Sequence, residues 1–228
     1  MNMNFRLTIS DFRLNCRAVR SPLVLLLVLV SLAGCNAIGA IAYKVSPLPK
    51  TPAKYKPYPE MGVVVVENSR NPGASEIDAQ QIAALVSDEL RKNKVMPLVE
   101  DNVVNDLRDK DPKVFKTMAL AAVGRAVGAR QMVYVDIGRI VIETSVADQM
   151  VKGTIEATVR VIDTKTGVVR WPSESVQGYP VSIDTPLLAV DDKMTEQGLR
   201  RRMHEYLAIS IGRLFYDWTN ENDVRDKP

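Results

Sequence analysis

Apolar residues follow two different periods along this chain, and the order of the periods predicts an α/β domain. The run Gly62–Val66 is apolar at each position, which is typical of a central strand that is covered on both faces. From Ser75 onwards, apolar residues recur every three or four positions as far as Leu90, which predicts an amphipathic helix. Ser75 and Asp78 have the spacing of a capping box at the start of this helix.

The next apolar segments predict a second strand and then further helix. Val95–Val99 is short, and Pro97 places it at a sheet edge or a bulge because proline cannot donate to the ladder. A short helix is predicted at Asn102–Leu107. A longer helix follows, for which Asp111 is a suitable cap, and Gly128 suits the left-handed residue just past its end.

Two long segments with strand periodicity come next and predict an antiparallel meander. Residues 131–143 keep apolar side chains on one face until Gly138, where the phase slips as it does at a bulge. Residues 151–162 alternate throughout, so that one face is buried and the other is wet. The turn Asp163–Gly167 leads into a returning strand that begins with Val168–Trp171. Pore-forming strands alternate in the same way, but helices that cover one face of a soluble sheet give the same pattern, and we favour the soluble sheet.

A last amphipathic helix is predicted from Thr195 to Trp218, after an irregular stretch that follows Tyr179–Pro180. Residues 219–228 are polar and predict a frayed tail. The predicted fold class is therefore α/β (α+β), with a single mixed sheet in the order β-α-β-α-β-β-β-α and helices packed on the sheet. The span 61–218 is of ordinary size for one domain and contains no visible repeat.

The amino-terminal residues 1–34 have the pattern of a signal peptide, in which four arginines precede the apolar run Leu23–Val30. The run ends in a motif that resembles the lipobox of bacterial lipoproteins, which consists of Leu32, Ala33, Gly34 and Cys35. This resemblance implies that Cys35 receives diacylglycerol and becomes the first residue of the mature protein. A permanent membrane span is the alternative, but the segment 22–33 is shorter than the roughly 20 residues that a span needs.

Residues 35–60 are rich in proline and lysine and lack any helical or strand period. The lipobox resemblance implies a lipidated amino terminus at Cys35, and the composition of the residues that follow predicts a semi-rigid tether that holds the domain away from the membrane. The alternative is that Tyr43, Tyr55 and Tyr58 pack the segment along the surface of the domain, especially in its second half. The sequence leaves both arrangements open.

The basic charge of the chain comes from its signal peptide. The full sequence has 30 basic and 27 acidic residues, and removing residues 1–34 takes away four arginines and Asp11, which leaves 26 of each sign. A near-neutral mature chain gives no support to nucleic-acid binding. Cys16 leaves with the signal peptide and Cys35 is consumed by lipid, so no thiol remains for a disulfide, a metal or a nucleophile.

Candidate catalytic residues are few. His204 is the only histidine, and it lies beside three successive arginines, so a solvated or interface histidine is favoured over a catalytic base. No nucleophile lies in a sharp-turn motif of the G-x-S-x-G kind, which argues against triad chemistry. The arginines are either a solvated helix face or a patch that docks a partner. We predict no catalytic residue and retain as possible partner-binding residues Arg200, Arg201 and Arg202.

Two sets of carboxylates are better explained by structure than by chemistry. Asp184, Asp191 and Asp192 precede the last helix but lack the ligand spacing of a calcium loop, which favours a role at a turn or helix start. Asp136 and Glu143 share one strand and lie on opposite faces, unless the bulge between them realigns them. No metal and no cofactor is predicted.

The order of the elements, together with two segments, resembles a known group of envelope proteins. The segments are Gly128–Asp136, which follows a helix, and Arg160–Trp171, at the predicted hairpin. They look like the α/β domain of curli-secretion-channel (CsgG-type) lipoproteins, and the amino-terminal domain of TolB and the penicillin-binding-protein activator lipoproteins share a similar layout. The resemblance implies a protein that assembles or regulates envelope machinery without being an enzyme.

The expected function is therefore that of a non-enzymatic, lipid-anchored envelope protein that binds or helps to assemble an envelope protein or a peptidoglycan partner. An oligomeric secretion-channel subunit is the alternative. Asn36 follows Cys35 at the position where aspartate favours retention in the inner membrane of many Gram-negative bacteria. By that resemblance the protein is expected at the periplasmic face of the outer membrane.

Overall fold

The computed structural model describes residues 50–68, 75–145, 150–189 and 195–219. The predicted lipobox, the first half of the predicted tether, Asp191 and Asp192 lie outside these residues. The helices are α2 (Glu76–Lys92), α3 (Asp101–Lys110), α4 (Pro112–Thr117), α5 (Leu120–Ala126) and α6 (Glu196–Gly212). The strands are β1 (Lys50–Thr51), β2 (Gly62–Glu67), β3 (Gln131–Ser145), β4 (Met150–Asp163), β5 (Val169–Trp171), β6 (Tyr179–Asp184), β7 (Leu188–Ala189) and β8 (Trp218–Thr219).

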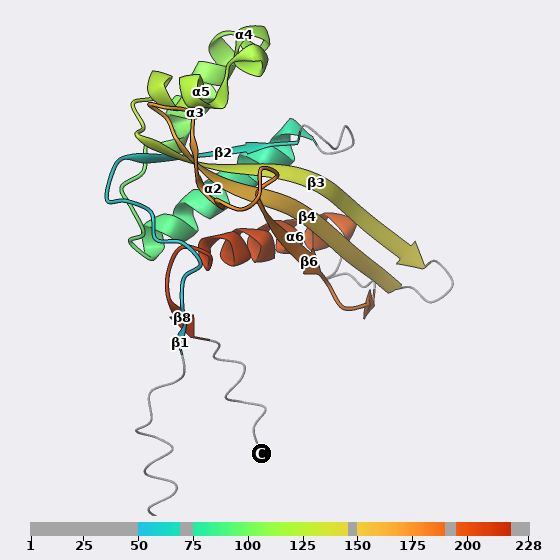
Figure 1. Cartoon of the computed structure of the whole chain (residues 1–228). Helices are drawn as coiled ribbons and strands as arrows, with labels where there is room; N and C mark the ends of the chain where they lie inside the picture. The colour runs from blue at the N-terminus through green and yellow to red at the C-terminus, as the bar shows by residue number, and fades with distance from the viewer. Residues whose placement is uncertain (1–49, 69–74, 146–149, 190–194, 220–228) are drawn as a thin grey trace, which may run out of the picture. The chain divides into compact units, whose positions relative to one another are not determined.

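The strands form one mixed sheet and a separate two-stranded pair, β1 with β8 (Figure 1). In the larger sheet the order is β2-β3-β4-β5, and β6 and β7 also pair with β4. β2 runs parallel to β3, and the other pairs are antiparallel. The predicted fold class, a mixed sheet with helices packed on it, is confirmed.

Helices cover both faces of this sheet and create two apolar clusters. β2 and β3 alternate between the clusters, because Val64 and Val133 belong to one and Val63 and Met132 to the other. α2 and α6 cover the first cluster, while α3, α4 and α5 contribute to the second. Figure 1 shows these two groups of helices on opposite sides of the strands. The continuous apolar run of β2 therefore follows from burial on both faces.

The central position predicted for Gly62–Val66 is wrong. β2 has β3 as its only strand neighbour in the described sheet, apart from a single bridge from Gly62 to Leu98. That bridge is what remains of the strand predicted at Val95–Val99. A continuous apolar run reports that both faces are covered, but it carries no information about how many neighbours the backbone has.

The meander is confirmed, including the bulge. The register of β3 against β4 shifts between Ile137 and Arg139, next to Gly138. All of the predicted inward positions of β4, from Val151 to Val161, are buried. β6 was not predicted as a strand of this sheet, although it follows β5 along the same edge of β4. Its mixed burial and its Pro180 hide the strand period.

Two predicted helices are shorter in the structure. The helix expected between Asp111 and Gly128 is divided into α4 and α5, because Met118 and Ala119 are extended. This change of direction allows Phe115 and the α5 residues to reach the same apolar cluster. The last helix ends at Gly212, and a turn with buried Leu214 and Phe215 precedes β8.

The segment 50–60 packs against the domain, which decides between the two arrangements that the sequence left open for these residues. β1 pairs with β8, and the amides of Lys54 and Tyr55 donate to the carbonyl of Leu214. Tyr55 also packs against the first apolar cluster. The compact unit begins at Lys50, ahead of the start at Met61 that the hydrophobic pattern predicts.

Candidate functional site

A large hollow lies between α2 and α6 and has a volume of about 870 Å³. We call it the α2–α6 groove. Its lining includes residues from the amino-terminal halves of both helices, among them Ile77, Asp78, Gln81, Arg200, Arg201 and His204. Both helices are capped at this end, α2 by Ser75 and α6 by Thr195. The groove thus contains two of the three predicted partner-binding arginines.

Arg200 links the two helices across the groove. Its Nη1 lies 3.3 Å from Asp78 Oδ2, and its Nη2 lies 3.9 Å from Glu196 Oε1. The same oxygen of Asp78 accepts from the amide and hydroxyl of Ser75, within the capping box predicted from the sequence. Asp78 is 5% exposed. Its carboxylate is hydrogen-bonded by Ser75 at the start of α2 and lies beside Arg200 of α6. Arg200 therefore has a structural role, because it joins α6 to α2 through Asp78.

His204 is buried beside this pair, although the sequence favoured a solvated or interface histidine. It is 1% exposed, and its Nε2 lies 3.5 Å from Asp78 Oδ1. Neither ring nitrogen makes a hydrogen bond to a described residue. Burial lowers the pKa of His204, Asp78 opposes this effect, and Arg200 reinforces it. The neutral ring is thus favoured, and the charged groups beside it are the carboxylate of Asp78 and the guanidinium of Arg200.

Arg201 and Arg202 differ from Arg200. Both are exposed, and neither forms an ion pair with another described residue. Arg201 lines the groove, whereas Arg202 does not. Successive residues of a helix are about 100° apart, so three arginines in a row cannot share one face. Among the lining residues that the structure describes, Arg201 and Glu205 are the exposed charges of this groove.

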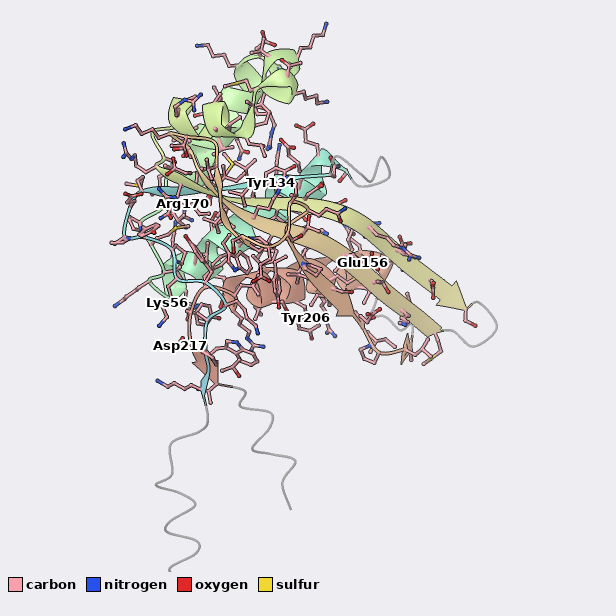
Figure 2. All side chains as sticks on the ribbon, viewed as in Figure 1. Lys56, Tyr134, Glu156, Arg170, Tyr206 and Asp217 are labelled. Atoms are coloured by element: carbon pink, nitrogen blue, oxygen red, sulfur yellow. The ribbon has the colours of Figure 1, made fainter. Side chains whose placement is uncertain are left out.

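A second polar cluster surrounds Arg170 and was not predicted. We call Tyr58, Glu60, Asp163 and Arg170 the Arg170 cluster. Arg170 donates to Asp163 through Nε at 3.1 Å and also through Nη2, and its Nη1 lies 3.3 Å from Glu60 Oε2. Its guanidinium lies 4.8 Å from the ring centroid of Tyr58. Arg170 belongs to β5, and Figure 2 shows it near the end of the sheet where β3 begins.

The Arg170 cluster joins the segment 50–60 to the hairpin of β4 and β5. The backbone amide of Thr166 and then the guanidinium of Arg170 lower the pKa of Asp163 to about 2. Beside it, Trp171 stacks on Tyr55 and Tyr179, with ring centroids 5.8 Å and 5.1 Å apart. Lys56, in the same segment 50–60, forms an ion pair with Asp217, in which Nζ lies 3.6 Å from Oδ2 (Figure 2). The sequence signal for these contacts was weak, because the partners are far apart in the chain.

The remaining predicted carboxylates do not form a catalytic pair. The bulge does realign Asp136 and Glu143, because they lie opposite Thr158 and Lys152, which share a face of β4. Thr158 and Lys152 are six residues apart along β4, so Asp136 and Glu143 lie roughly 20 Å apart along the sheet. This distance exceeds the spacing of glycosidase carboxylates. Asp184 accepts a hydrogen bond from Thr154 and lies 3.9 Å from Lys152. Within the described ranges, no three histidine, cysteine or acidic residues are placed to hold a metal ion.

Comparison with known proteins assigns this chain to a family. The sequence model of the family described as peptidoglycan-synthase activator LpoB matches residues 45–176, which is more than half of the chain. This chain belongs to the LpoB family. The LpoB match covers the segment 50–60, β2 to β5 and the whole Arg170 cluster, whereas α6 and its arginines follow it. Of the groups that the sequence resembles, the activator lipoproteins are thus supported, and the CsgG and TolB groups are not.

Solved structures similar to this LpoB family member include several bacterial proteins. Lipoprotein GNA1162 from Neisseria meningitidis has 13% identity and a TM-score of 0.44, with 67% of this chain and 98% of that chain covered. A PelC dodecamer from Paraburkholderia phytofirmans has 14% identity and a TM-score of 0.37, with coverages of 75% and 99%. With TM-scores of 0.44 and 0.37, these similarities support no inference about function. No curated protein matches the chain significantly.

Among the described helices, none combines the length and the apolar character that crossing a membrane requires.

Proposed function

We propose that this protein is a lipid-anchored, non-enzymatic activator of a peptidoglycan synthase. The observation that carries the proposal is the match to the family of peptidoglycan-synthase activators over residues 45–176. The predicted signal peptide and lipobox support an address in the cell envelope. The secretion-channel alternative gains no support from the family match.

In this proposal residues 1–34 are removed, Cys35 carries the lipid, and residues 36–49 join it to the compact unit that begins at Lys50. Such a linker spans at most about 50 Å when fully extended. It is shorter than the tether predicted from composition, because the segment 50–60 packs against the domain. The periplasmic face of the outer membrane is the proposed location, on the basis of Asn36.

The α2–α6 groove is the surface that we propose to contact the synthase. Two features support it: Arg201 is exposed without an acidic partner among the described residues, and Ile77 at the rim is 65% exposed. Arginine is frequent among the residues that dominate the binding energy of protein interfaces. Arg200 and Asp78 hold the two helices that form the groove walls.

The test is a glycan-polymerisation assay. The membrane-anchored protein is cross-linked in cells, the captured synthase is identified and purified, and its rate is measured with and without the full mature chain. We expect an increased rate. Arg201→Ala should weaken the activation, whereas its neighbour Arg202→Ala, which does not line the groove, should activate like the parent chain. A purified synthase whose rate is unchanged by the parent chain, or capture of no synthase, would refute the proposed function.

The anchor has its own test. Metabolic labelling with a palmitate analogue should mark the parent chain, and Cys35→Ala should remove both the label and the membrane association. A Cys35→Ala chain that remains in the membrane fraction would show that another segment anchors the protein. Because the assay in solution does not require the lipid, this result is independent of the activation experiment.

A further inference from the structure

β3 has an outer edge that no other described strand pairs with. β2 pairs with β3 from Gln131 to Asp136, whereas the pairing of β3 with β4 continues to Ser145. On the side away from β4, the described residues supply no strand partner beyond Asp136. We call residues 137–144 the open edge. Figure 1 shows this half of β3 at the margin of the sheet, beyond the end of β2.

The backbone groups of the open edge are directed outward at alternate residues. Gly153 uses both its amide and its carbonyl for hydrogen bonds to Thr185, on the side of β4 that faces away from β3. Ile142 lies opposite Gly153, so these two residues are a non-hydrogen-bonded pair of the antiparallel ladder. The amide and carbonyl of Ile142 therefore point to the open edge, and those of Ile140 do the same. Such a row of groups is a template for another strand.

The side chains of the open edge form a symmetric pattern. Arg139, Val141 and Glu143 lie on one face, while Ile140 and Ile142 pack on the other, against the first apolar cluster. Arg139 and Glu143 are exposed, and neither forms an ion pair within the described part of the chain. Val141 is at the centre of this sequence. Charges of opposite sign thus lie at equal distances on either side of it.

We propose that the open edge pairs with the open edge of a second copy of this chain, antiparallel and about a twofold axis at Val141. In this register Arg139 of each copy lies opposite Glu143 of the other, and Ile140 lies opposite Ile142. The two isoleucines meet with their outward amides and carbonyls, so they exchange hydrogen bonds. The pairing covers residues 138–144 of both copies and closes both edges. It goes beyond the proposed function and does not depend on it.

Other registers are less favourable for physical reasons. A slip by one residue would bring inward and outward backbone groups together and place apolar side chains against charged ones. A slip by two residues in one direction makes the partner strand clash with β2, because β2 already pairs with this edge of β3 as far as Asp136. A slip by two in the other direction places Val141 opposite Glu143 and removes both ion pairs. Charge complementarity and the length of the open edge select the same register.

A cysteine at the axis tests the register. In the proposed dimer Val141 faces its own counterpart across a non-hydrogen-bonded pair, at a Cα separation of about 4.5 Å that a disulfide can span. We expect full-length Val141→Cys, in membranes under mild oxidation, to give a covalent dimer. Glu156→Cys is the matched control, because it lies on the same face of β4, where its counterpart would be roughly 20 Å away, three strand spacings across and four residues along the strands. The parent chain measures any background from Cys35.

Charge reversal tests whether the partner is a second copy. Arg139→Glu or Glu143→Arg alone places like charges opposite each other twice, and we expect roughly tenfold weaker dimerisation in each case. The double variant should dimerise like the parent chain. A mixture of the two single variants should form a mixed dimer, because each supplies the charge that the other lacks. Sedimentation of the detergent-solubilised full chain, at several concentrations, measures all four cases.

A parent chain that sediments as a monomer at all concentrations, with no disulfide in Val141→Cys, would overturn the proposal. A disulfide or cross-link from position 141 to a different protein, without a homodimer, would also overturn it and assign the open edge to strand addition by that protein. Loss of dimer in both single variants without recovery in the double variant would reject this register. These measurements contain no synthase, so their failure leaves the proposed function untouched.

Discussion

At the scale of single residues, His204 shows how a position that looks solvated in sequence is decided by packing. It follows three arginines in the chain, yet its ring lies between α2 and α6, and neither nitrogen has a hydrogen bond to a residue that the structure describes. Its neighbours in the structure are Asp78 and Arg200. The effect of burial exceeds that of Asp78, so the net direction of the pKa is downward.

This direction predicts a pH dependence of stability. The unfolded chain binds a proton at His204 more readily than the folded chain, so protonation favours unfolding as the pH falls through the ordinary histidine pKa. We expect the free energy of unfolding of the parent chain to decrease between neutral pH and about pH 5.5. In His204→Leu the decrease should be smaller. Denaturant unfolding at each pH measures both, and equal slopes in the two chains would contradict the assignment.

Two glycines, one in α5 and one in β3, predict opposite outcomes for the same substitution to alanine. A Cβ at Gly124 would overlap Thr164, which cannot move readily because its hydroxyl donates to the carbonyl of Ala129. Gly124→Ala should therefore destabilise the protein by about 1–3 kcal/mol, even though alanine favours helix. At Gly138 the nearest atom to a Cβ is the carbonyl oxygen of Glu156 at 3.7 Å, an ordinary contact. Gly138→Ala should be nearly neutral, and thermal melts of the two variants compare them directly.

At the scale of elements, the Arg170 cluster joins the chain before β2 to the turn after β4. We expect Arg170→Ala to lower the free energy of unfolding by about 2 kcal/mol, because Asp163 and Glu60 lose a charged donor that is largely buried. Limited proteolysis should then cut within residues 50–60 faster than in the parent chain. Arg202→Ala, an exposed arginine without an ion pair to a described residue, is the control and should change neither measurement.

Asp163 gives the cluster a distinct response to acid. Its pKa lies at about 2 in the folded chain against an ordinary value of 3.8. The contribution of its charge is therefore present above the ordinary value and is lost as the pH falls through the folded one. The stability difference between the parent chain and Asp163→Asn should stay constant from about pH 7 to about pH 5 and narrow only at lower pH. A difference that narrows near neutral pH would exclude Asp163 as its source.

At the scale of the whole molecule, the segment 50–60 belongs to the folded unit, and its strand β1 pairs with β8. A chain that begins at Lys50 should therefore keep the stability of the parent chain. A chain that begins at Met61 loses the stack of Tyr55 on Trp171 and the ion pair of Glu60 with Arg170, and should be at least about 2 kcal/mol less stable. Unfolding followed by tryptophan fluorescence measures this, and equal stability would contradict a structural role of the segment.

Local patterns by themselves determined much of this fold. The capping box at Ser75, the alternation of β4, the bulge at Gly138 and the turn Asp163–Gly167 all follow from chemistry within a few residues of each position. These features predicted the class of the fold and the order of most of its elements. The lipobox remains a prediction, because it lies outside the described residues.

Only the tertiary structure decided the features that depend on neighbours far apart in the chain. Burial of both faces made β2 look central, yet its place at the margin depends on which strands pair with it. The Arg170 cluster brings together Glu60 and Arg170, and the α2–α6 groove brings together Asp78, Arg200 and His204. The sequence pattern records the period and polarity of each element. It does not record the partners, because long-range contacts are selected by the geometry of the assembled sheet and its helices.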